Sequence, residues 1–296
     1  VVDAEGQQVP YQITSDEKVI FPVTVQANGS AVYTIKAGIP QECPVKACGR
    51  YYPERVDDVA WENDLTAFRA YGPALQETGE RAFGYDIWTK YNTTEPVVEA
   101  RYEGELNPDM KAKITELGKT DPKAAQELYR SVSYHVDHGN GLDCYKVGPT
   151  LGGGTTALMA GDTIIYPYCY ATQEILDNGP LRFTVKLVYN PLVVKGDSTI
   201  IETRIITLDA GSYCNKTVVS YTNLKETMPL AVGIVLHEPD GAIVADAANG
   251  YMTYVDPTDN AGGDNGKIFV GAAFPTLVKE AKAVLFPEKE KKELRG

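Results

Sequence analysis

Alternating apolar and polar residues dominate the chain from about residue 155 onward, and they predict a series of β-strands. The alternation runs through the segments TALMAGDTIIYPYCYATQEI, LRFTVKLVYNPLVV, TIIETRIITLDA, TVVSYTN, LAVGIVLHE and KIFVGAAF. Turn-forming sequences such as DNGP, KGDS and AGS separate these segments, with no helical pattern between them. Strands at this spacing favour antiparallel sheets packed face to face. Residues 1–40 show a similar pattern, with Asn28-Gly29 at a predicted hairpin turn.

The region between these two β-rich parts is mixed. Residues 41–56 contain Cys, Pro and Gly and are predicted to form an irregular loop. The segment DDVAWENDLTAFRAYGPAL fits either a helical stripe or an alternating strand, and we favour a strand whose polar residues face a cleft. Residues 105–133 are predicted as a helical insertion, because Asp121 can cap a helix that has Pro122 in its first turn.

These patterns predict a mainly β protein, a large antiparallel β-sandwich with a small helical insertion. We expect one domain over residues 1–296, since neither a repeat nor a low-complexity linker divides the chain. The charged residues 287–296 are expected to be a solvated tail. Residues 1–9 resemble the middle of a hairpin, which suggests that a strand preceding Val1 belongs to the fold.

Charge and composition narrow the partners. The chain carries 28 Lys and Arg against 40 Asp and Glu, a net charge of −12, which argues against binding a nucleic-acid backbone. No apolar run approaches the roughly 20 residues of a membrane span. The 19 Tyr and 7 Phe favour aromatic rings with a polar tip, which suit half-wet binding clefts. The three histidines include His135 and His138, only three positions apart.

Residues 51–73 form the first cluster with candidate chemistry. Sugar sites combine an aromatic face with carboxylates and amides that bind paired hydroxyls, and this segment supplies both. Its candidate substrate-binding residues are Arg55, Asp57, Asp58, Trp61, Glu62, Asn63, Asp64, Arg69 and Tyr71. The alternative is a strand whose arginines and aspartates form internal salt bridges.

Residues 133–149 form the second cluster. A histidine beside a carboxylate, with Tyr and Lys close by, is a general acid/base set, so His135, His138 and Tyr145 are candidate catalytic residues. Asp143 and Lys146 are candidate substrate-binding residues in the same segment. A metal site made of His135, His138 and Asp143 is a rival interpretation. The third interpretation is a polar loop whose histidines cap turns.

Weaker signals lie elsewhere in the chain. Tyr85, a further candidate catalytic residue, and Trp88, a candidate substrate-binding residue, could line the same cleft, although an alternating aromatic strand explains them equally well. A possible Ca²⁺ site, with carboxylate and amide oxygens as ligands, is formed by Asp256, Asp259, Asn260 and Asp264. That stretch lacks the EF-hand register, and an Asp/Gly-rich turn is the preferred interpretation.

The five cysteines allow a small disulfide loop. Cys43 and Cys48 are close enough in sequence to pair in an oxidising compartment, and ordinary free thiols are the preferred alternative.

The segments PERVDDVAWEND and HVDHGNGLDCYKVGP resemble a secreted, uncharacterised family, a domain of unknown function from bacteria that degrade complex polysaccharides. The resemblance covers most of the chain. The stretch from ILDNGPLRFTVKL to ITLDAGS is also similar to the β-supersandwich of galactose-mutarotase-like proteins and some polysaccharide lyases. The resemblance implies a carbohydrate cleft and a periplasmic or secreted location.

Three functions follow as hypotheses. The first is β-elimination on a uronic-acid-containing oligosaccharide, with His135 or His138 as base, Tyr145 or Tyr85 as acid, and a basic residue against the substrate carboxylate. The candidates for that basic residue are Arg55, Arg69 and Lys146. The second is glycoside hydrolysis or mutarotase-like chemistry, in the hydrolytic case with a carboxylate pair from Asp57, Asp58, Glu62 or Asp64. The third is carbohydrate binding without catalysis. The oligomeric state stays open.

Overall fold

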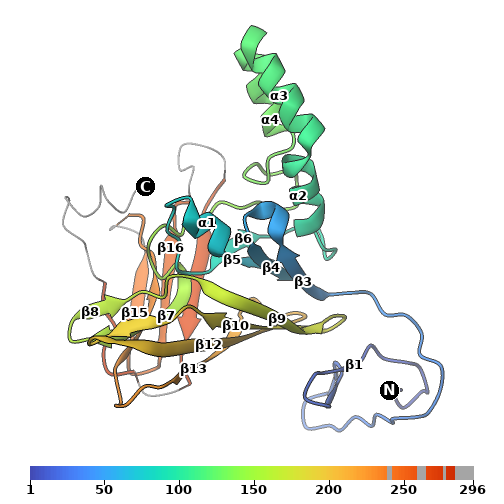
Figure 1. Ribbon diagram of the computed structural model, residues 1–296. Helices are drawn as coiled ribbons and strands as arrows, with labels where there is room; N and C mark the ends of the chain where they lie inside the picture. The colour runs from blue at the N-terminus through green and yellow to red at the C-terminus, as the bar shows by residue number, and fades with distance from the viewer. Residues whose placement is uncertain (239–241, 259–264, 276–277, 284–296) are drawn as a thin grey trace.

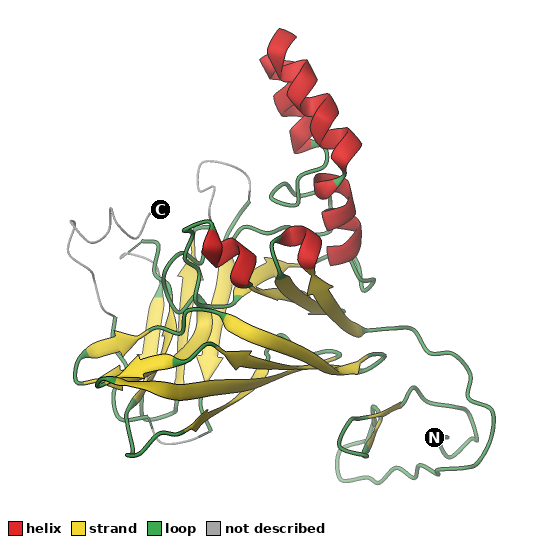
Figure 2. Ribbon diagram, viewed as in Figure 1, coloured by secondary structure: helices red, strands yellow, loops and turns green. Residues whose placement is uncertain are grey.

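The computed structural model describes residues 1–238, 242–258, 265–275 and 278–283, and they form a mainly β protein (Figure 2). The prediction of a mainly β fold with antiparallel sheets is confirmed. A five-stranded sheet contains β9 (Tyr170–Asn178), β10 (Arg182–Tyr189), β11 (Leu192–Val194), β12 (Asp197–Asp209) and β13 (Lys216–Thr222). Two three-stranded sheets contain β7 (Gly153–Ala160), β8 (Thr163–Ile165) and β14 (Leu230–Ile234), and β15 (Ile243–Asp246), β16 (Tyr251–Asp256) and β17 (Ile268–Ala273).

A four-stranded antiparallel sheet carries most of the first sequence cluster. It consists, in spatial order, of β3 (Ala47–Tyr52), β4 (Asp58–Asn63), β5 (Thr66–Ala70) and β6 (Asp86–Thr89). The segment DDVAWENDLTAFRAYGPAL was predicted to favour a strand over a helix, and β4 and β5 confirm this over Asp58–Asn63 and Thr66–Ala70. The prediction of an irregular loop over residues 41–56 is wrong in part, because β3 pairs with β4 along its whole length. Its sequence ACGRYY has little strand character of its own, so the neighbouring strand supplies the register.

Both faces of the four-stranded sheet are covered. On one face Trp61 stacks between Phe68 and Phe183, with ring centroids 6.0 and 6.2 Å away, and so joins this sheet to the five-stranded sheet. On the other face Trp88 packs against Tyr102 and other residues outside the sheet. All six residues of β4 are consequently buried. The expectation that its polar residues face an open cleft is wrong for this reason.

The helical insertion is confirmed and forms an arm that projects away from the sheets (Figure 1). It consists of α2 (Val98–Leu106), α3 (Pro108–Thr120) and α4 (Pro122–Arg130), and shorter helical turns lie at η1 (Pro53–Arg55) and α1 (Pro73–Glu77). The predicted cap is present, since the Asp121 side chain accepts a hydrogen bond from the Ala124 amide at 3.0 Å. Pro122 occupies the first helical turn, where its missing N–H leaves no hydrogen bond unmade.

The prediction of paired strands over residues 1–40 is wrong for most of that segment. Strand pairing is limited to β1 (Gln12–Ile13) with β2 (Val19–Ile20) and to isolated bridges at Val2. The Asn28-Gly29 turn forms, with the Gly29 amide donating to the Gln26 carbonyl at 2.9 Å, but its flanks are not strands. Alternation determines which side chains share a face, whereas a strand also needs a neighbour within hydrogen-bonding distance.

Candidate active site

The two sequence clusters meet at the buried side chain of Arg69, in the middle of β5. Its guanidinium forms an ion pair with Asp86, the residue directly opposite on β6, and with Asp143 at 2.7 Å. A third carboxylate, Asp58 on β4, lies 3.8 Å from Nε of Arg69. The Arg69 side chain is 3% exposed. Residues 51–73 and 133–149 therefore share one interior region, held together by charge.

Aromatic rings enclose this ion cluster. The guanidinium carbon of Arg69 lies 4.8 Å from the ring centroid of Tyr71, 5.2 Å from Trp88 and 5.8 Å from Tyr134. The Tyr102 hydroxyl also accepts a hydrogen bond from Arg69 at 3.3 Å. Rings at these distances attract a cation through their negative faces and exclude water, which strengthens the ion pairs.

The cluster contains more carboxylates than guanidinium groups. Asp58, Asp86 and Asp143 face Arg69, with Arg55 as the second cation at 3.8 Å from Asp58. Burial raises the pKa of Asp58 to about 7, although Arg69 and Arg55 oppose the shift. Burial and the nearby Asp86 also raise the pKa of Asp143. The surplus carboxylate therefore holds a proton more readily than an ordinary aspartate.

The segment after α4 carries His135 from the interior to the surface. Tyr134 is buried and stacks on Trp88 at 5.1 Å, which fixes the backbone next to the histidine. The His135 ring packs against Tyr134 at 4.4 Å, and its side chain is 46% exposed. Two glycines with positive φ, Gly139 and Gly141, then turn the chain back so that Asp143 re-enters the ion cluster.

A pocket of about 220 Å³ lies where His135 reaches the surface. Its lining residues are Gln126, Tyr129, Arg130, Ser133, His135, Val136, Asp143, Cys144 and Asn265. Nδ1 of His135 lies 3.2 Å from the Asp143 carbonyl oxygen and 3.6 Å from its carboxylate. A proton on Nδ1 is thus accepted by the Asp143 carbonyl, with the Asp143 carboxylate close by, and Nε2 is the nitrogen left to accept a proton from a substrate. The pocket therefore combines an oriented imidazole, a buried carboxylate behind it and a guanidinium.

His138, the other predicted base, lies differently. Its Nε2 faces the Ser133 carbonyl oxygen at 2.9 Å, and it is not among the residues that line the pocket. This contact fixes the turn over residues 133–138, in agreement with the interpretation of a histidine that caps a turn. Of the two candidate bases, His135 alone lines the pocket.

The predicted tyrosine acids lie outside the pocket. Tyr145 is buried, and its hydroxyl donates to the Gly152 carbonyl at 2.9 Å. Tyr85 is buried in the core between the sheets. Its ring centroid lies 5.8 Å from the Trp61 ring centroid and 5.6 Å from the guanidinium carbon of Arg204. Lys146 is exposed and does not line the pocket either. Tyr145 and Lys146 are close to the histidines in sequence, but their side chains do not reach the pocket.

The polar side chains of Glu62 and Asn63, on β4, are bound by other residues of the chain. Glu62 accepts hydrogen bonds from the amides of Val97 and Val98, at the start of α2. It also forms an ion pair with Lys90 at 2.8 Å. Asn63 donates to the carbonyls of residues 209 and 212 at 2.7 and 2.6 Å.

Asp57 and Asp64 bond to neighbouring loops. The Asp57 carboxylate accepts from the Tyr51 hydroxyl and from the Ala74 amide at 3.2 Å. Asp64 accepts from the Gly211 amide at 2.7 Å. These two residues organise the loops at the ends of the sheet through hydrogen bonds, whereas the internal ion pairs of the alternative interpretation are formed by Asp58 with Arg55 and Arg69.

Of the residues that line the pocket, only His135 and Asp143 were candidate site residues from the sequence, and three of those that were missed lie on α4. Gln126, Tyr129 and Arg130 have the i, i+3, i+4 spacing that places side chains on one helix face. Their polar and aromatic character on that face was a usable signal, because α4 leads directly into the histidine segment.

The metal interpretations stay predictions. Among the described residues, no group of three or more His, Cys, Asp or Glu side chains is placed to hold a metal ion. Asp259, Asn260 and Asp264 of the predicted calcium cluster lie outside the described residues. Asp256 faces Nδ1 of His237 at 2.5 Å, while Nε2 of that ring faces the Lys146 carbonyl. Cys43 and Cys48 do not form a disulfide.

The chain belongs to the family described as domain of unknown function DUF4861, which it matches over residues 1–295. It is also similar to uncharacterized protein P7 of Formosa agariphila, with 28% identity over 227 residues. That alignment covers 74% of this chain and 51% of the relative, so the chain spans about half of the relative's length. No solved structure matches the chain. Within the described residues, no helix is long and apolar enough to cross a membrane.

Proposed function

We propose that the chain is an enzyme of polysaccharide breakdown that cleaves uronic-acid-containing oligosaccharides by β-elimination in the His135 pocket. The observation that carries this proposal is the His135 imidazole itself, partly exposed in the pocket while Asp143 holds Nδ1 from behind. Such an arrangement favours proton abstraction, because the imidazolium formed at Nε2 is stabilised by the carboxylate on the other side of the ring.

The roles of base, cation and acid can be assigned to residues that line the pocket. His135 removes the proton α to the substrate carboxylate, and the electron pair of that C–H bond forms a carbon–carbon double bond. The bond from the neighbouring carbon to the glycosidic oxygen breaks, and that oxygen takes a proton from the Tyr129 hydroxyl. Arg130 faces the substrate carboxylate and stabilises the charge that develops on it. Arg130 and Tyr129 thus replace the basic residues and tyrosines first considered from the sequence.

Arg69 supports the base without meeting the substrate. It is buried beneath the pocket and ion-paired with Asp143. Its guanidinium donates to the Asp143 carboxylate at 2.7 Å and so keeps that carboxylate oriented beneath His135. Arg69 is therefore a positioning residue. The size of the pocket, about 220 Å³, is below the roughly 300–1,000 Å³ of sites for drug-sized ligands and suits one sugar ring.

The supersandwich architecture and a periplasmic or secreted location are part of the same proposal. The location rests on the resemblance of the two sequence clusters to a secreted family of polysaccharide-degrading bacteria. The architecture rests on the similarity of the stretch from ILDNGPLRFTVKL to ITLDAGS to supersandwich proteins, together with the antiparallel sheets of the fold. Hydrolysis has weaker support, because Asp58 and Glu62 are buried in ion pairs, and among the described residues Asp143 is the one carboxylate that lines the pocket. Binding without catalysis is separated from the proposal by experiment.

The test measures the unsaturated product of elimination by its absorbance, with unsulfated and sulfated uronic oligosaccharides as substrates. We expect His135→Ala to lower kcat by roughly 10²–10⁴, the contribution of a general base. His138→Ala, which removes the other candidate base, should retain activity because His138 does not line the pocket. Full activity of His135→Ala, or saccharide binding with no unsaturated product from any substrate, would overturn the assignment.

A further inference from the structure

A second groove, distinct from the His135 pocket, lies at the edge of the four-stranded sheet. Its volume is about 520 Å³, and it is lined by Asp64, Leu65, Lys90, Tyr91, Asn92, Thr93, Thr94 and Tyr213. The lining residues come from three connections, namely the β4–β5 turn, the segment after β6 and the β12–β13 loop. None of these residues belongs to the pocket of His135.

Two exposed tyrosine rings, Tyr91 and Tyr213, line the groove. Tyr213 is 70% exposed and Tyr91 is 42% exposed, values that are high for large aromatic side chains. A sugar ring presents axial C–H groups that pack on an aromatic face, and its hydroxyls bond to the polar groups at the rim. Thr93, Thr94 and Asn92 supply such hydroxyl and amide groups beside the rings.

The charges of the groove select against an anionic ligand. The Lys90 ammonium is already bound by Glu62 at 2.8 Å, the Asn63 carbonyl at 2.6 Å and the Glu95 carbonyl at 2.9 Å. Its side chain is 1% exposed, so it offers little positive charge to solvent. Asp64 adds a carboxylate that lies 4.0 Å from Lys46. An uncharged ligand rich in hydroxyls fits this balance better than a uronate or a phosphate.

The groove is built before a ligand arrives. Lys90 ties its floor to β4, and Asn63 holds the loop that leads to Tyr213 through the carbonyls of residues 209 and 212. Asn92 adopts a left-handed φ of 54°, and its side-chain amide donates to the Gly139 carbonyl at 3.4 Å. A preformed site loses little conformational entropy on binding.

We propose that this groove binds neutral saccharide units by stacking them on Tyr91 and Tyr213. The inference stands apart from the chemistry of the His135 pocket, because it needs neither the imidazole nor Arg130. The contact between Asn92 and Gly139 joins the groove to the turn that follows His135. If the proposed elimination is correct, the groove binds an uncharged part of the same glycan.

The test titrates the full chain with neutral linear hexasaccharides of glucose, mannose, xylose and galactose, by calorimetry and by saturation-transfer NMR. At least one should bind, and Tyr91→Ala or Tyr213→Ala should each weaken it roughly two- to tenfold, with a larger loss in the double variant. Tyr168→Ala is the matched control, since Tyr168 is 46% exposed and lies outside the groove. It should leave the affinity unchanged.

Two results would overturn the groove proposal. One is the absence of binding to all four hexasaccharides. The other is binding that survives the double tyrosine variant. His135→Ala distinguishes this proposal from the proposed function, because it should lower the kcat of elimination by roughly 10²–10⁴ while hexasaccharide affinity stays at the unmutated value. Binding that is lost in His135→Ala but kept in the tyrosine variants would assign the saccharide to the pocket instead.

Discussion

Arg69 shows how a residue can be important to a site without touching a substrate. The sequence offered it as a ligand for a substrate carboxylate, yet three carboxylates of the chain surround it. Asp143, the partner that links it to His135, is 74 positions away in sequence. Burying this charge without partners would cost several kcal/mol, so its local sequence could only indicate that a partner exists, not which one.

The surplus carboxylate of this cluster makes stability depend on pH. The pKa of Asp58 is raised to about 7 in the folded chain, against about 4 for an unfolded aspartate. Its contribution to stability is therefore fully present below pH 4 and is lost as pH rises toward 7. Asp58→Asn carries no titrating group, so we expect the variant to gain stability relative to the unmutated chain between pH 5 and pH 8. The gain should be at most a few kcal/mol.

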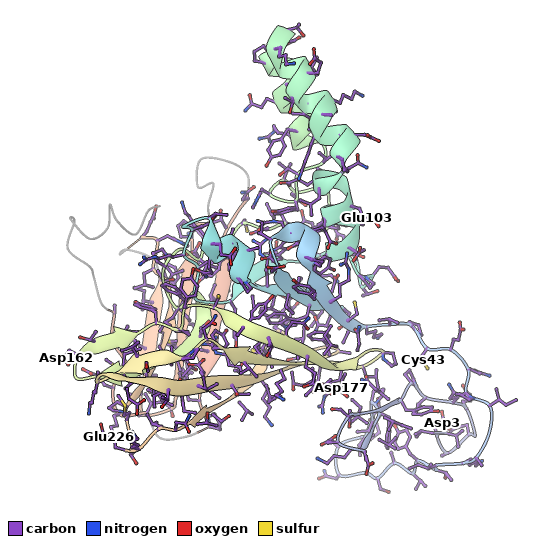
Figure 3. All side chains as sticks on the ribbon, viewed as in Figure 1. Asp3, Cys43, Glu103, Asp162, Asp177 and Glu226 are labelled. Atoms are coloured by element: carbon purple, nitrogen blue, oxygen red, sulfur yellow. The ribbon has the colours of Figure 1, made fainter. Side chains whose placement is uncertain are left out.

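Urea unfolding at pH 5 and pH 8 measures this gain. Asp162→Asn is the control, because Asp162 is exposed at the turn between β7 and β8, far from the cluster (Figure 3). That substitution should shift the two free energies of unfolding equally. An Asp58→Asn variant whose loss or gain is the same at both pH values would show that Asp58 is already ionised at pH 5.

At the scale of elements, the turn between His135 and Asp143 positions the candidate base. Gly141 has φ of +95°, and a Cβ on it would lie 2.0 Å from the Thr89 carbonyl oxygen. Gly139 has φ of +90° but open space around it. We expect Gly141→Ala to lower the free energy of unfolding by at least about 2 kcal/mol and to reduce activity, because the turn must shift away from β6.

Gly139→Ala is the matched control for the close contact. It introduces the same left-handed strain without the collision, so it should cost about 1 kcal/mol. Thermal unfolding and the elimination assay on both variants separate the two effects. Equal losses of stability in the two variants would mean that the backbone conformation, rather than the approach to Thr89, requires glycine.

The elements that the sequence predicted well are those whose signals are local. The Asp121–Pro122 start of α4 and the strands after residue 155 depend on caps, turns and alternation within a few residues. Strand β3 was missed because its pairing with β4 determines it, and the early hairpins were overpredicted because alternation alone cannot provide a partner. The candidate site follows the same rule. His135 and Asp143 were found from one segment, whereas Arg130 required the spatial position of α4.

At the scale of the whole molecule, residues 1–46 are attached to the sheets by few contacts. Figure 1 shows this segment to one side of the sheets, and Asp177 lies at the end of β9 that faces it (Figure 3). Asp177 accepts hydrogen bonds from the amide and hydroxyl of Ser15 at 2.6 and 3.3 Å. The Gln12 side chain makes three more with the backbone of Leu181 and Arg182.

These contacts predict that the N-terminal segment can be released without unfolding the sheets. The double variant Gln12→Ala/Asp177→Ala removes five hydrogen bonds of about 1 kcal/mol each, so local opening should increase at least tenfold. Trypsin should then cut after Lys18 and Lys36 faster by a similar factor, as mass spectrometry would measure.

The control for the release is Asp3→Ala, because within the described part of the chain the Asp3 carboxylate bonds to amides of its own segment, those of Glu5 and Gln7. The cleavage rate of Asp3→Ala should stay near that of the unmutated chain. The near-ultraviolet circular dichroism of both variants should be unchanged, since Trp61 and Trp88 lie in the sheets. Cleavage after Lys36 that is equally fast in all three chains would show that the two anchors do not hold the segment. A loss of the near-ultraviolet signal in the double variant would instead make the segment part of the cooperative fold, because removing its anchors would then have unpacked the tryptophans.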